Sequence, residues 1–306
     1  MKLIAPDYYG NFCCIADKCK HSCCIGWEID IDKDSLEFYS GISGTFGEKL
    51  KATIAYDGDT HHFKLAKGDR CPFLNEQGLC DIITELGEDA LCNICADHPR
   101  FRNFFSGRTE LGLGMCGEAA AKLILTKEDK AVLCELEDDG IADDIDMWDT
   151  ILLSERHRLI EIAQDRSMPV EHRAQKILYV ANAGLPKKSL TEYLEFYSHL
   201  ERLDPSWDNM LSLLNKQQVH NIDHLDTALE QLLVYFLYRH IPSASDKSEL
   251  AGYTAFAVLS YKLVRALCER TGADIDTLCE IARAYSCEIE YSEENTRAIV
   301  DMLMLL

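Results

Sequence analysis

The sequence is poor in positive charge and has no long apolar run. Its 306 residues include 31 Lys and Arg against 52 Asp and Glu, a formal net charge of −21 at pH 7. Proteins that bind DNA, RNA or anionic membranes normally display a basic surface, so this charge argues against all three. No apolar run approaches the roughly 20 residues that span a bilayer. We therefore expect no nucleic-acid partner and no membrane insertion, and the acidity favours a basic partner or simply solubility.

Export and repeat signals are also missing. The first segment, MKLIAPDYYGNF, has no positively charged stretch followed by an apolar one, so nothing in it directs export. The sequence shows no repeat with a period of about 20 to 50 residues and no low-complexity tract. Apolar residues make up 47% of the chain, as in globular proteins. These features predict a cytoplasmic globular protein.

Cysteine, in contrast, is abundant, with 14 residues in the chain. The early cysteines fall into two groups, Cys13, Cys14, Cys19, Cys23 and Cys24, and then Cys71, Cys80, Cys92, Cys95 and Cys116. Thiols collected this densely form disulfides or hold a metal. The remaining four lie on apolar faces, and we expect them to pack as small hydrophobic residues: Cys134, Cys268, Cys279 and Cys287.

Three observations favour metal over disulfides. The chain has no export signal, and the cytoplasm keeps thiols reduced. The neighbouring pairs Cys13–Cys14 and Cys23–Cys24 would need sharp local geometry to reach distant partners. A chain of 306 residues can also bury an ordinary core without covalent staples. Free thiols this close would bind Zn²⁺ or an iron–sulfur cluster.

The spacing of the thiols favours a cluster over a zinc site. Zinc fingers and ribbons bring their ligands as two tidy pairs, whereas Cys92 and Cys95 alone form a C-x2-C pair here. The other thiols come singly from several segments, which suits an iron–sulfur cluster held between loops. We expect an apolar shell around it from Phe73, Leu74, Leu91, Phe101 and Phe104.

The chain changes character near residue 125. Short patterns and turn signals come first, and helical periodicity runs almost unbroken from residue 147. The sequence therefore predicts an α+β fold, in which a small Cys-rich metal-binding domain with short strands precedes a mainly α-helical bundle. We place the Cys-rich domain at 1–125, a strand and acidic connector at 126–146, and a bundle of six to eight helices at 147–306.

Local signals place several elements within the first part. Strands are expected at 27–32 and 108–113, and a hairpin at 52–56 and 61–65 around the turn at 57–60. Helical segments are expected at 34–39, 82–86, 90–94 and 118–125, and the connector begins with a strand at 131–137.

Four segments of the sequence together resemble the flagellin lysine-N-methylase family of bacteria. They are CKHSCCIGWEIDID, the run from CPFL to GLCDI, LGEDALCNICADHPRF and MCGEAAAKLIL, and the late helix EQLLVYFLYRHIP is similar as well. The first three are shared with a broader group of Cys-rich zinc- or iron-chelating proteins. One departure is the Gly117 that follows Cys116, where the family usually has proline.

The resemblance implies transfer of a methyl group from S-adenosylmethionine to lysine ε-amines of flagellin or a similar exported protein. It also implies an iron–sulfur cluster, of the 4Fe–4S type, whose ligands are drawn from Cys19, Cys23, Cys24, Cys71, Cys80, Cys92, Cys95 and Cys116. Zinc is the alternative metal. Cys19-x3-Cys23 begins the radical C-x3-C-x2-C signature, but Gly26 breaks it, so a structural or cofactor-orienting cluster is favoured over radical chemistry.

Three residues are candidates for cofactor binding. Gly112 and Gly114 open a G-x-G-x-x-G pattern that precedes the expected helix 118–125, and such a loop lets backbone amides approach a phosphate or the methionine part of the cofactor. The alternative is a glycine-rich turn that presents Cys116. Arg100 could bind the carboxylate at the methionine end, or it could be a structural arginine after a helix.

Methylation of lysine needs a neutral amine, and free lysine has a pKa near 10.4. The site must therefore desolvate the amine or supply a base. Tyr235, Tyr238, Tyr253 and Tyr261 could line such a channel, or they belong to the bundle core. No general base is identified by sequence. The other function class open to this chain is a zinc- or iron-binding scaffold without catalysis.

Overall fold

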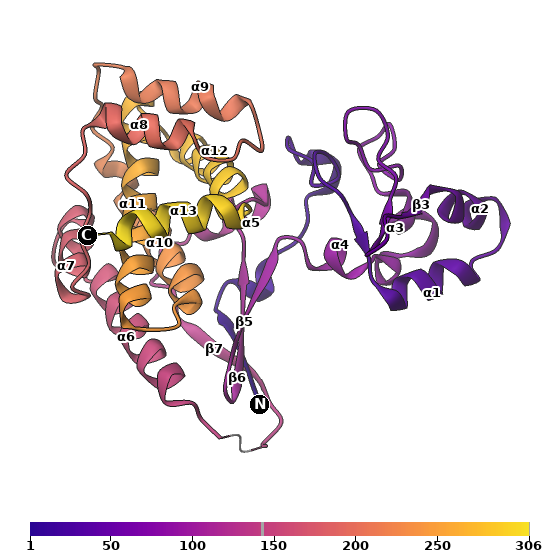
Figure 1. Ribbon diagram of the computed structural model, residues 1–306, viewed down its shortest axis with the longest axis horizontal. Helices are drawn as coiled ribbons and strands as arrows, with labels where there is room; N and C mark the ends of the chain where they lie inside the picture. The colour runs from indigo at the N-terminus through magenta and orange to yellow at the C-terminus, as the bar shows by residue number, and fades with distance from the viewer. Residues whose placement is uncertain (142–143, 306) are drawn as a thin grey trace. The chain divides into compact units, whose positions relative to one another are not determined.

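The computed structural model describes residues 1–141 and 144–305. The chain forms two compact units (Figure 1). Cys13–Phe101 make up the first, which we call the cysteine unit. Met1–Phe12 together with Arg102–Leu306 make up the second, which we call the helical unit. Each unit has its own core and is described by itself.

The cysteine unit contains a small antiparallel sheet and short helices. The sheet has the order β2-β4-β3, with β2 at Asp30–Ile31, β4 at His61–Phe63 and β3 at Ile54–Tyr56. Its α-helices are α1 (Lys33–Gly41), α2 (Gly44–Thr53), α3 (Asp81–Leu86) and α4 (Asn93–Asp97). The unit also contains the 3₁₀ turns η2 (Ala16–Lys18) and η3 (Glu88–Ala90). A further 3₁₀ turn, η1 (Tyr9–Asn11), belongs to the N-terminal segment of the helical unit.

Side chains of aspartate set the local turns of this unit. Asp32 ends the β2 strand and caps α1, because its Oδ1 accepts the Ser35 N–H at 3.0 Å. Asp57 shapes the hairpin turn, since its Oδ1 accepts the N–H groups of Asp59 and Thr60, each at 2.9 Å. The expected hairpin is thus present, with its strands shortened.

Aromatic side chains fill the core of the cysteine unit. Tyr39, Phe63 and Phe73 are fully buried, and the rings of Phe63 and Phe73 meet edge to face at 4.9 Å. The Tyr39 hydroxyl donates to the Ala90 carbonyl at 2.7 Å and so ties α1 to the segment before Cys92. This apolar cluster is the surface on which the thiols described below are packed.

The helical unit begins with a mixed four-stranded sheet. Its order is β5-β6-β1-β7, with strands at Arg100–Phe105, Arg108–Leu113, Lys2–Pro6 and Leu133–Asp138. The first two residues of β5, Arg100 and Phe101, belong to the cysteine unit. The N-terminal strand β1 runs parallel to β6 and antiparallel to β7. The chain therefore uses its first residues to complete a sheet whose other strands come more than 90 positions later.

Helices account for most of the rest of this unit. One of them, α5 (Glu118–Leu125), connects β6 to β7. Eight α-helices follow within the described part of residues 147–305, namely α6 (Met147–Ala163), α7 (Val170–Val180), α8 (Leu190–Ser198), α9 (Ser206–Ser212), α10 (Asp226–His240), α11 (Lys247–Thr271), α12 (Ile275–Tyr285) and α13 (Glu293–Met304). Figure 1 shows α10 and α11 within this bundle, and both are buried along most of their length.

Short helical turns link these helices. They are η4 (Leu213–Asn215), η5 (Asp223–Leu225), η6 (Ile241–Ser243) and η7 (Ser286–Glu290), the last being a π-helical segment between α12 and α13. Gly272 ends α11 in the left-handed conformation with φ 64°, as expected for a C-terminal cap. None of the helices formed by residues 1–141 and 144–305 has the length and apolar character needed to cross a bilayer.

Buried charges join the sheet to the bundle. Glu110 on β6 pairs with Arg156 on α6 at 2.7 Å, and their side chains are 0% and 2% exposed. Glu230 on α10 accepts from both Arg166 and Arg173. Each of these carboxylates is paired, as buried charges must be.

The observed architecture confirms the expected α+β fold with a mainly helical later part. The expected strand 108–113 and helix 118–125 coincide with β6 and α5. The division into units differs from the expected boundary at 125, because residues 102–125 pack with the bundle. This segment belongs to the helical unit, in which its side chains Leu111, Leu113 and Ile124 are buried. Of the expected connector, residues 142 and 143 lie outside the described residues, as does residue 306 of the expected bundle.

Candidate metal centre

All fourteen cysteines are free thiols. Five of them belong to one apolar cluster in the cysteine unit. Cys71 and Cys92 are buried there, and Cys24, Cys80 and Cys95 are half-buried against the same residues. Phe73, Leu74 and Leu91 belong to this cluster as expected. Phe104, in contrast, is 76% exposed on β5 of the sheet.

Backbone hydrogen bonds connect the two groups of cysteines that the sequence contains. The Cys71 N–H donates to the Cys24 carbonyl at 2.8 Å, although 46 residues separate them along the chain. The Gly26 N–H donates to the Asp69 carbonyl at 2.9 Å and extends this pairing. Cys80 lies opposite Leu74 in an isolated bridge, directly before α3. Cys92 directly precedes α4, which carries Cys95.

Burial dominates the pKa values of Cys71 and Cys80, and nearby backbone amides oppose it only in part. Burial raises the pKa of the Cys71 thiol to about 12, while the N–H groups of Phe73 and Leu74 act in the opposite direction. Burial also raises the pKa of Cys80, against the amides of Ile82 and Ile83. Hydrogen bonds to sulfur are a feature of cluster ligands, but burial outweighs the amides here, so both groups favour the protonated thiol.

Two pairs of thiols share a proton in the same region. A hydrogen bond from Cys23 lowers the pKa of Cys24 to about 7. A hydrogen bond from Cys95 likewise lowers the pKa of Cys92 below its ordinary value. The same hydrogen bond is the largest cause that raises the pKa of Cys95, and burial raises it further. The thiols of Cys92, Cys24 and Cys71 also raise this pKa, so these sulfurs lie close to one another. The lowered pKa values of Cys24 and Cys92 shift each toward the thiolate, the form in which cysteine binds a metal.

The donor set fits a thiolate-bound metal group in its chemistry. Five thiols, an apolar surround and amides directed at sulfur are the features that such a group requires. Within residues 1–141 and 144–305, however, no three side chains of Cys, His, Asp or Glu stand close enough together to hold a metal ion. Binding would therefore have to draw the sulfurs inward.

The other expected ligands do not belong to this apolar cluster, although Cys23 is hydrogen-bonded to Cys24. Cys19 is half-buried and donates to the His21 carbonyl at 3.1 Å, and Cys23 is exposed. Cys116 lies in the helical unit, where it is buried beside Tyr291 and Cys287. Cys116 follows β6, whose apolar residues pack with the bundle. The spacing of the cysteines in the sequence does not reveal that Cys116 belongs to the other unit. A shared cluster that includes Cys116 stays a prediction.

The three candidate cofactor residues are divided between the two units. Arg100 lies in the cysteine unit and donates to the Ala96 carbonyl at 3.1 Å. Gly112 and Gly114 are buried at the end of β6. The surrounding fold is not the dinucleotide-binding one, because β6 runs parallel to β1 while β7, which follows α5, runs antiparallel to it. Cofactor binding by these residues stays a prediction.

The glycine-rich segment is instead held by the bundle. The Met115 N–H donates to the Tyr235 hydroxyl at 3.2 Å, so this amide already has a partner. Tyr235 in turn donates to Glu290 at 3.0 Å. The alternative interpretation, a turn that presents Cys116, agrees with this arrangement.

Of the two alternatives for the four tyrosines, a substrate channel or the bundle core, the structure favours the core. Tyr235, Tyr238, Tyr253 and Tyr261 are all buried. The Tyr238 hydroxyl donates to the Leu111 carbonyl at 2.8 Å, and the Tyr261 hydroxyl accepts from Arg265 at 3.1 Å. Their hydroxyls thus satisfy bundle contacts.

Glu290 is a buried charged residue that sequence reasoning missed. Its carboxylate lies on the π-helical segment, is 0% exposed, and pairs with Arg239 at 3.2 Å and with His240. Burial acts to raise its pKa, but Arg239 and His240 outweigh burial and hold the pKa at about 2. Segments of this kind are frequent at functional sites. The sequence predicts only a helical bundle for residues 147–306, and no local signal marked this position.

Comparison with known proteins bears on the function of the chain. Two proteins named lysine-N-methylase, from Salmonella choleraesuis and Salmonella typhimurium, are each 27% identical to this chain over 143 residues. The chain is a relative of the lysine-N-methylases. Each alignment covers 42% of this chain and 34% of the methylase, so the chain spans about a third of the length of these relatives.

A further relative carries a flagellar name. The flagellar biosynthetic protein FliU of Salmonella muenchen is 27% identical over 140 residues, which cover 42% of this chain and 80% of FliU. No protein-family model matches the chain, and no solved structure matches it. The relationship to the lysine-N-methylases agrees with the resemblance carried by the cysteine motifs.

Proposed function

We propose that this protein is a lysine N-methyltransferase that modifies flagellin or a similar exported protein with S-adenosylmethionine. The observation that carries the proposal is the 27% identity to two proteins named lysine-N-methylase. The flagellar name of the third relative supports the choice of substrate. The net charge of −21 suits a partner that presents lysines.

The cysteine unit would hold the iron–sulfur cluster of this enzyme. Its ligands would be four of the five thiols of the apolar cluster, Cys24, Cys71, Cys80, Cys92 and Cys95. When bound, a cluster of the 4Fe–4S type would stabilise the unit and orient the cofactor, and zinc is the alternative occupant. Burial keeps Cys71 and Cys80 as thiols in the absence of metal, so binding would have to displace a proton from each of them.

The reaction itself requires little covalent chemistry from the protein. The neutral lysine nitrogen attacks the methyl carbon, the new C–N bond forms as the C–S bond to the sulfonium breaks, and the amine loses one proton. The protein must therefore align the two partners and remove water and a proton from the ammonium. A carboxylate beside the lysine would serve as the proton acceptor.

Incubation with flagellin and S-adenosylmethionine labelled at the methyl group tests the proposal. We expect label on lysine, located by mass spectrometry of the digested substrate. The Cys71→Ser variant should lose both iron and methylation, whereas Cys134→Ser, on strand β7, should keep both. Wild-type protein with its metal intact that labels no lysine in several candidate substrates would contradict the proposal.

The second candidate is a zinc- or iron-binding scaffold without catalysis. It is favoured by the concentration of thiols in one unit. It is also favoured because the chain covers only 34% of the length of the two lysine-N-methylases. This function predicts metal binding without affinity for S-adenosylmethionine. Isothermal titration calorimetry of the metal-loaded protein with S-adenosylmethionine separates the two candidates.

A further inference from the structure

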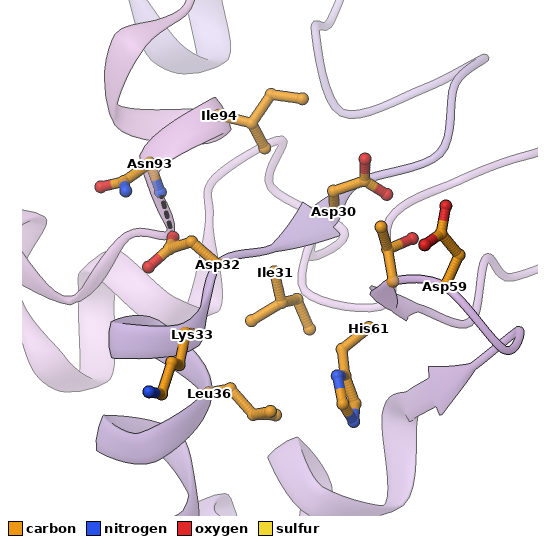
Figure 2. Close-up of a pocket in the computed structure, with 10 residues that line it drawn as sticks. Asp30, Ile31, Asp32, Lys33, Leu36, Asp59, His61, Asn93 and Ile94 are labelled. Carbon is orange, nitrogen blue, oxygen red and sulfur yellow. Dashed lines mark hydrogen bonds between the residues drawn. The ribbon is translucent and has the colours of Figure 1, made fainter.

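A pocket of about 430 Å³ opens beside the thiols of the cysteine unit. It is formed by β2, the start of α1, the turn between β3 and β4, and the start of α4 (Figure 2). The residues used below are three with apolar side chains, Ile31, Leu36 and Ile94, and three with carboxylates, Asp30, Asp32 and Asp59. The volume is in the lower part of the range for ligand sites, about 300 to 1,000 Å³.

The apolar residues give the pocket an uncharged floor. Ile31 is 6% exposed and lies opposite His61 in the β2–β4 pairing. Leu36, on the first turn and a half of α1, is half-buried. Ile94 is 36% exposed, so a large apolar side chain on α4 remains open to an incoming group. An aliphatic chain laid on this floor would be removed from water on the side that faces it.

The carboxylates give the pocket a negative rim. Asp30 and Asp59 are exposed, and both line the opening. The lining residues include three carboxylates and one lysine, Lys33, so the net charge of the rim is negative. A ligand with an apolar stem and a cationic head matches both parts, and among side chains of proteins lysine has this form.

Asp32 connects the pocket to the candidate metal centre. Its Oδ2 accepts the Asn93 N–H at 2.8 Å, the contact drawn in Figure 2. Burial acts to raise the pKa of Asp32, but the hydrogen bonds from Asn93 and Ser35 outweigh burial and keep the pKa below its usual value. The carboxylate is therefore ionised and fixes the start of α4 against the start of α1.

The wall of the pocket is the spacer of the Cys92–Cys95 pair. Asn93 and Ile94 are the two residues between these cysteines, and both line the pocket. Whatever occupies the pocket thus lies against the same short helix that carries two of the five thiols. One turn of α4 would separate a lysine bound here from the metal centre.

We propose that this pocket binds the side chain of the substrate lysine, with its methylenes on Ile31, Leu36 and Ile94 and its ammonium at Asp30 and Asp59. The inference rests on the proposed methyltransferase function and names the place on the chain where the lysine enters. Asp32 is a positioning residue, which holds the wall of the pocket in place through Asn93.

The test compares two peptides and matched variants of the full chain. One peptide carries a single lysine and the other has norleucine in its place, so that they differ by the cationic head. The Asp30→Asn/Asp59→Asn double variant removes two charges from the rim, and Glu76→Gln/Glu85→Gln removes two exposed charges elsewhere in the same unit. Binding is measured by fluorescence anisotropy, and KM, kcat and iron content are measured alongside.

We expect the double variant to weaken binding and raise the KM of the lysine peptide about five- to tenfold, a range set by two exposed ion pairs. Its kcat and iron content should equal those of wild type, and the control should leave all values unchanged. Asp59→Lys should raise KM further, because it places a cation where the ammonium binds.

The outcomes separate this inference from the proposed function. Methylation with an unchanged KM in both Asp variants would overturn the lysine pocket and leave the methyltransferase intact. Binding of the lysine peptide that depends on Asp30 and Asp59, without any methylation by wild type, would support the pocket and overturn the methyltransferase. Equal binding of the lysine and norleucine peptides to wild type would also overturn the pocket.

Discussion

Removal of the Glu290 charge should destabilise the helical unit strongly. The carboxylate is 0% exposed, accepts from Arg239 Nε at 3.2 Å and accepts from the Tyr235 hydroxyl at 3.0 Å. Glu290→Gln keeps the shape of the side chain but leaves Arg239, which is 12% exposed, without its counter-charge. Breaking one side of a buried pair costs about 3–5 kcal/mol, a large part of a total stability of about 5–15 kcal/mol.

Urea unfolding followed by far-UV circular dichroism measures this loss. With a slope of about 3 kcal/mol per M, a loss of about 3 kcal/mol moves the midpoint down by about 1 M. Glu137→Gln, which removes an exposed charge on β7, should leave the midpoint unchanged. The Arg239→Met/Glu290→Gln variant should lose less than the two single variants added together, because no unpaired charge stays buried.

The pH dependence gives the same prediction a second signature. The pKa of Glu290 in the folded protein, about 2, lies below its ordinary value of 4.5. A carboxyl whose pKa is lowered by folding stabilises the protein above its unfolded pKa and loses that contribution as pH falls through its folded pKa. The gap between wild type and Glu290→Gln should therefore be constant above about pH 4.5 and shrink on acidification toward about pH 2. A gap that is absent at neutral pH, or that grows on acidification, would refute the reasoning.

Three smaller predictions concern positions with local controls. Gly47→Ala should cost about 1–3 kcal/mol, because a Cβ there would overlap the Ile42 carbonyl, whereas Gly41→Ala meets nothing within 4 Å and should be nearly neutral in a thermal melt. Asp32→Ala should cost about 1–2 kcal/mol and raise amide exchange in α1 and α4, since it removes a helix cap and the Asn93 contact; unchanged exchange in α4 would contradict this. Tyr235→Phe should cost about 1 kcal/mol and speed exchange of the Met115 amide, and a protected Met115 amide would show that this hydrogen bond does not hold the segment.

Elements with strong local signals could be predicted from the sequence alone. The α5 helix begins after Gly117 and carries an unbroken apolar face, and its predicted bounds match those observed. The hairpin of β3 and β4 follows from the turn chemistry of Asp57. In both cases the residues that decide the structure are neighbours along the chain.

Elements defined by distant partners could not be predicted. The five residues of β1 carry no strand signal of their own. They form a strand because they pair with β6 and β7, which lie more than 100 residues later in the chain. The same limit hid the boundary between the units, since nothing within 102–125 shows that its apolar residues belong to the bundle. The helix α2 was missed because its weak pattern contains two glycines.

The candidate site shows the same division. Counting thiols identified Cys24, Cys71, Cys80, Cys92 and Cys95 as candidates, and the structure packs these five on one apolar cluster. Cys116 has the same residue type and a plausible spacing, yet its environment is set by α10 and the π-helical segment. The acidic pocket was invisible in the sequence, because its carboxylates come from two separate segments, the end of β2 with the cap of α1 and the turn between β3 and β4.

Iron and acid-labile sulfide content tests the central claim of a thiolate-bound cluster most directly. The protein is purified without oxygen, and its visible absorption spectrum is recorded alongside the two chemical assays. The account predicts about four iron and four sulfide per chain with a broad band near about 400 nm, lost in Cys71→Ser and kept in Cys134→Ser. Zinc without sulfide would contradict the cluster and favour the scaffold function, and fully reactive thiols without any metal would contradict a metal centre altogether.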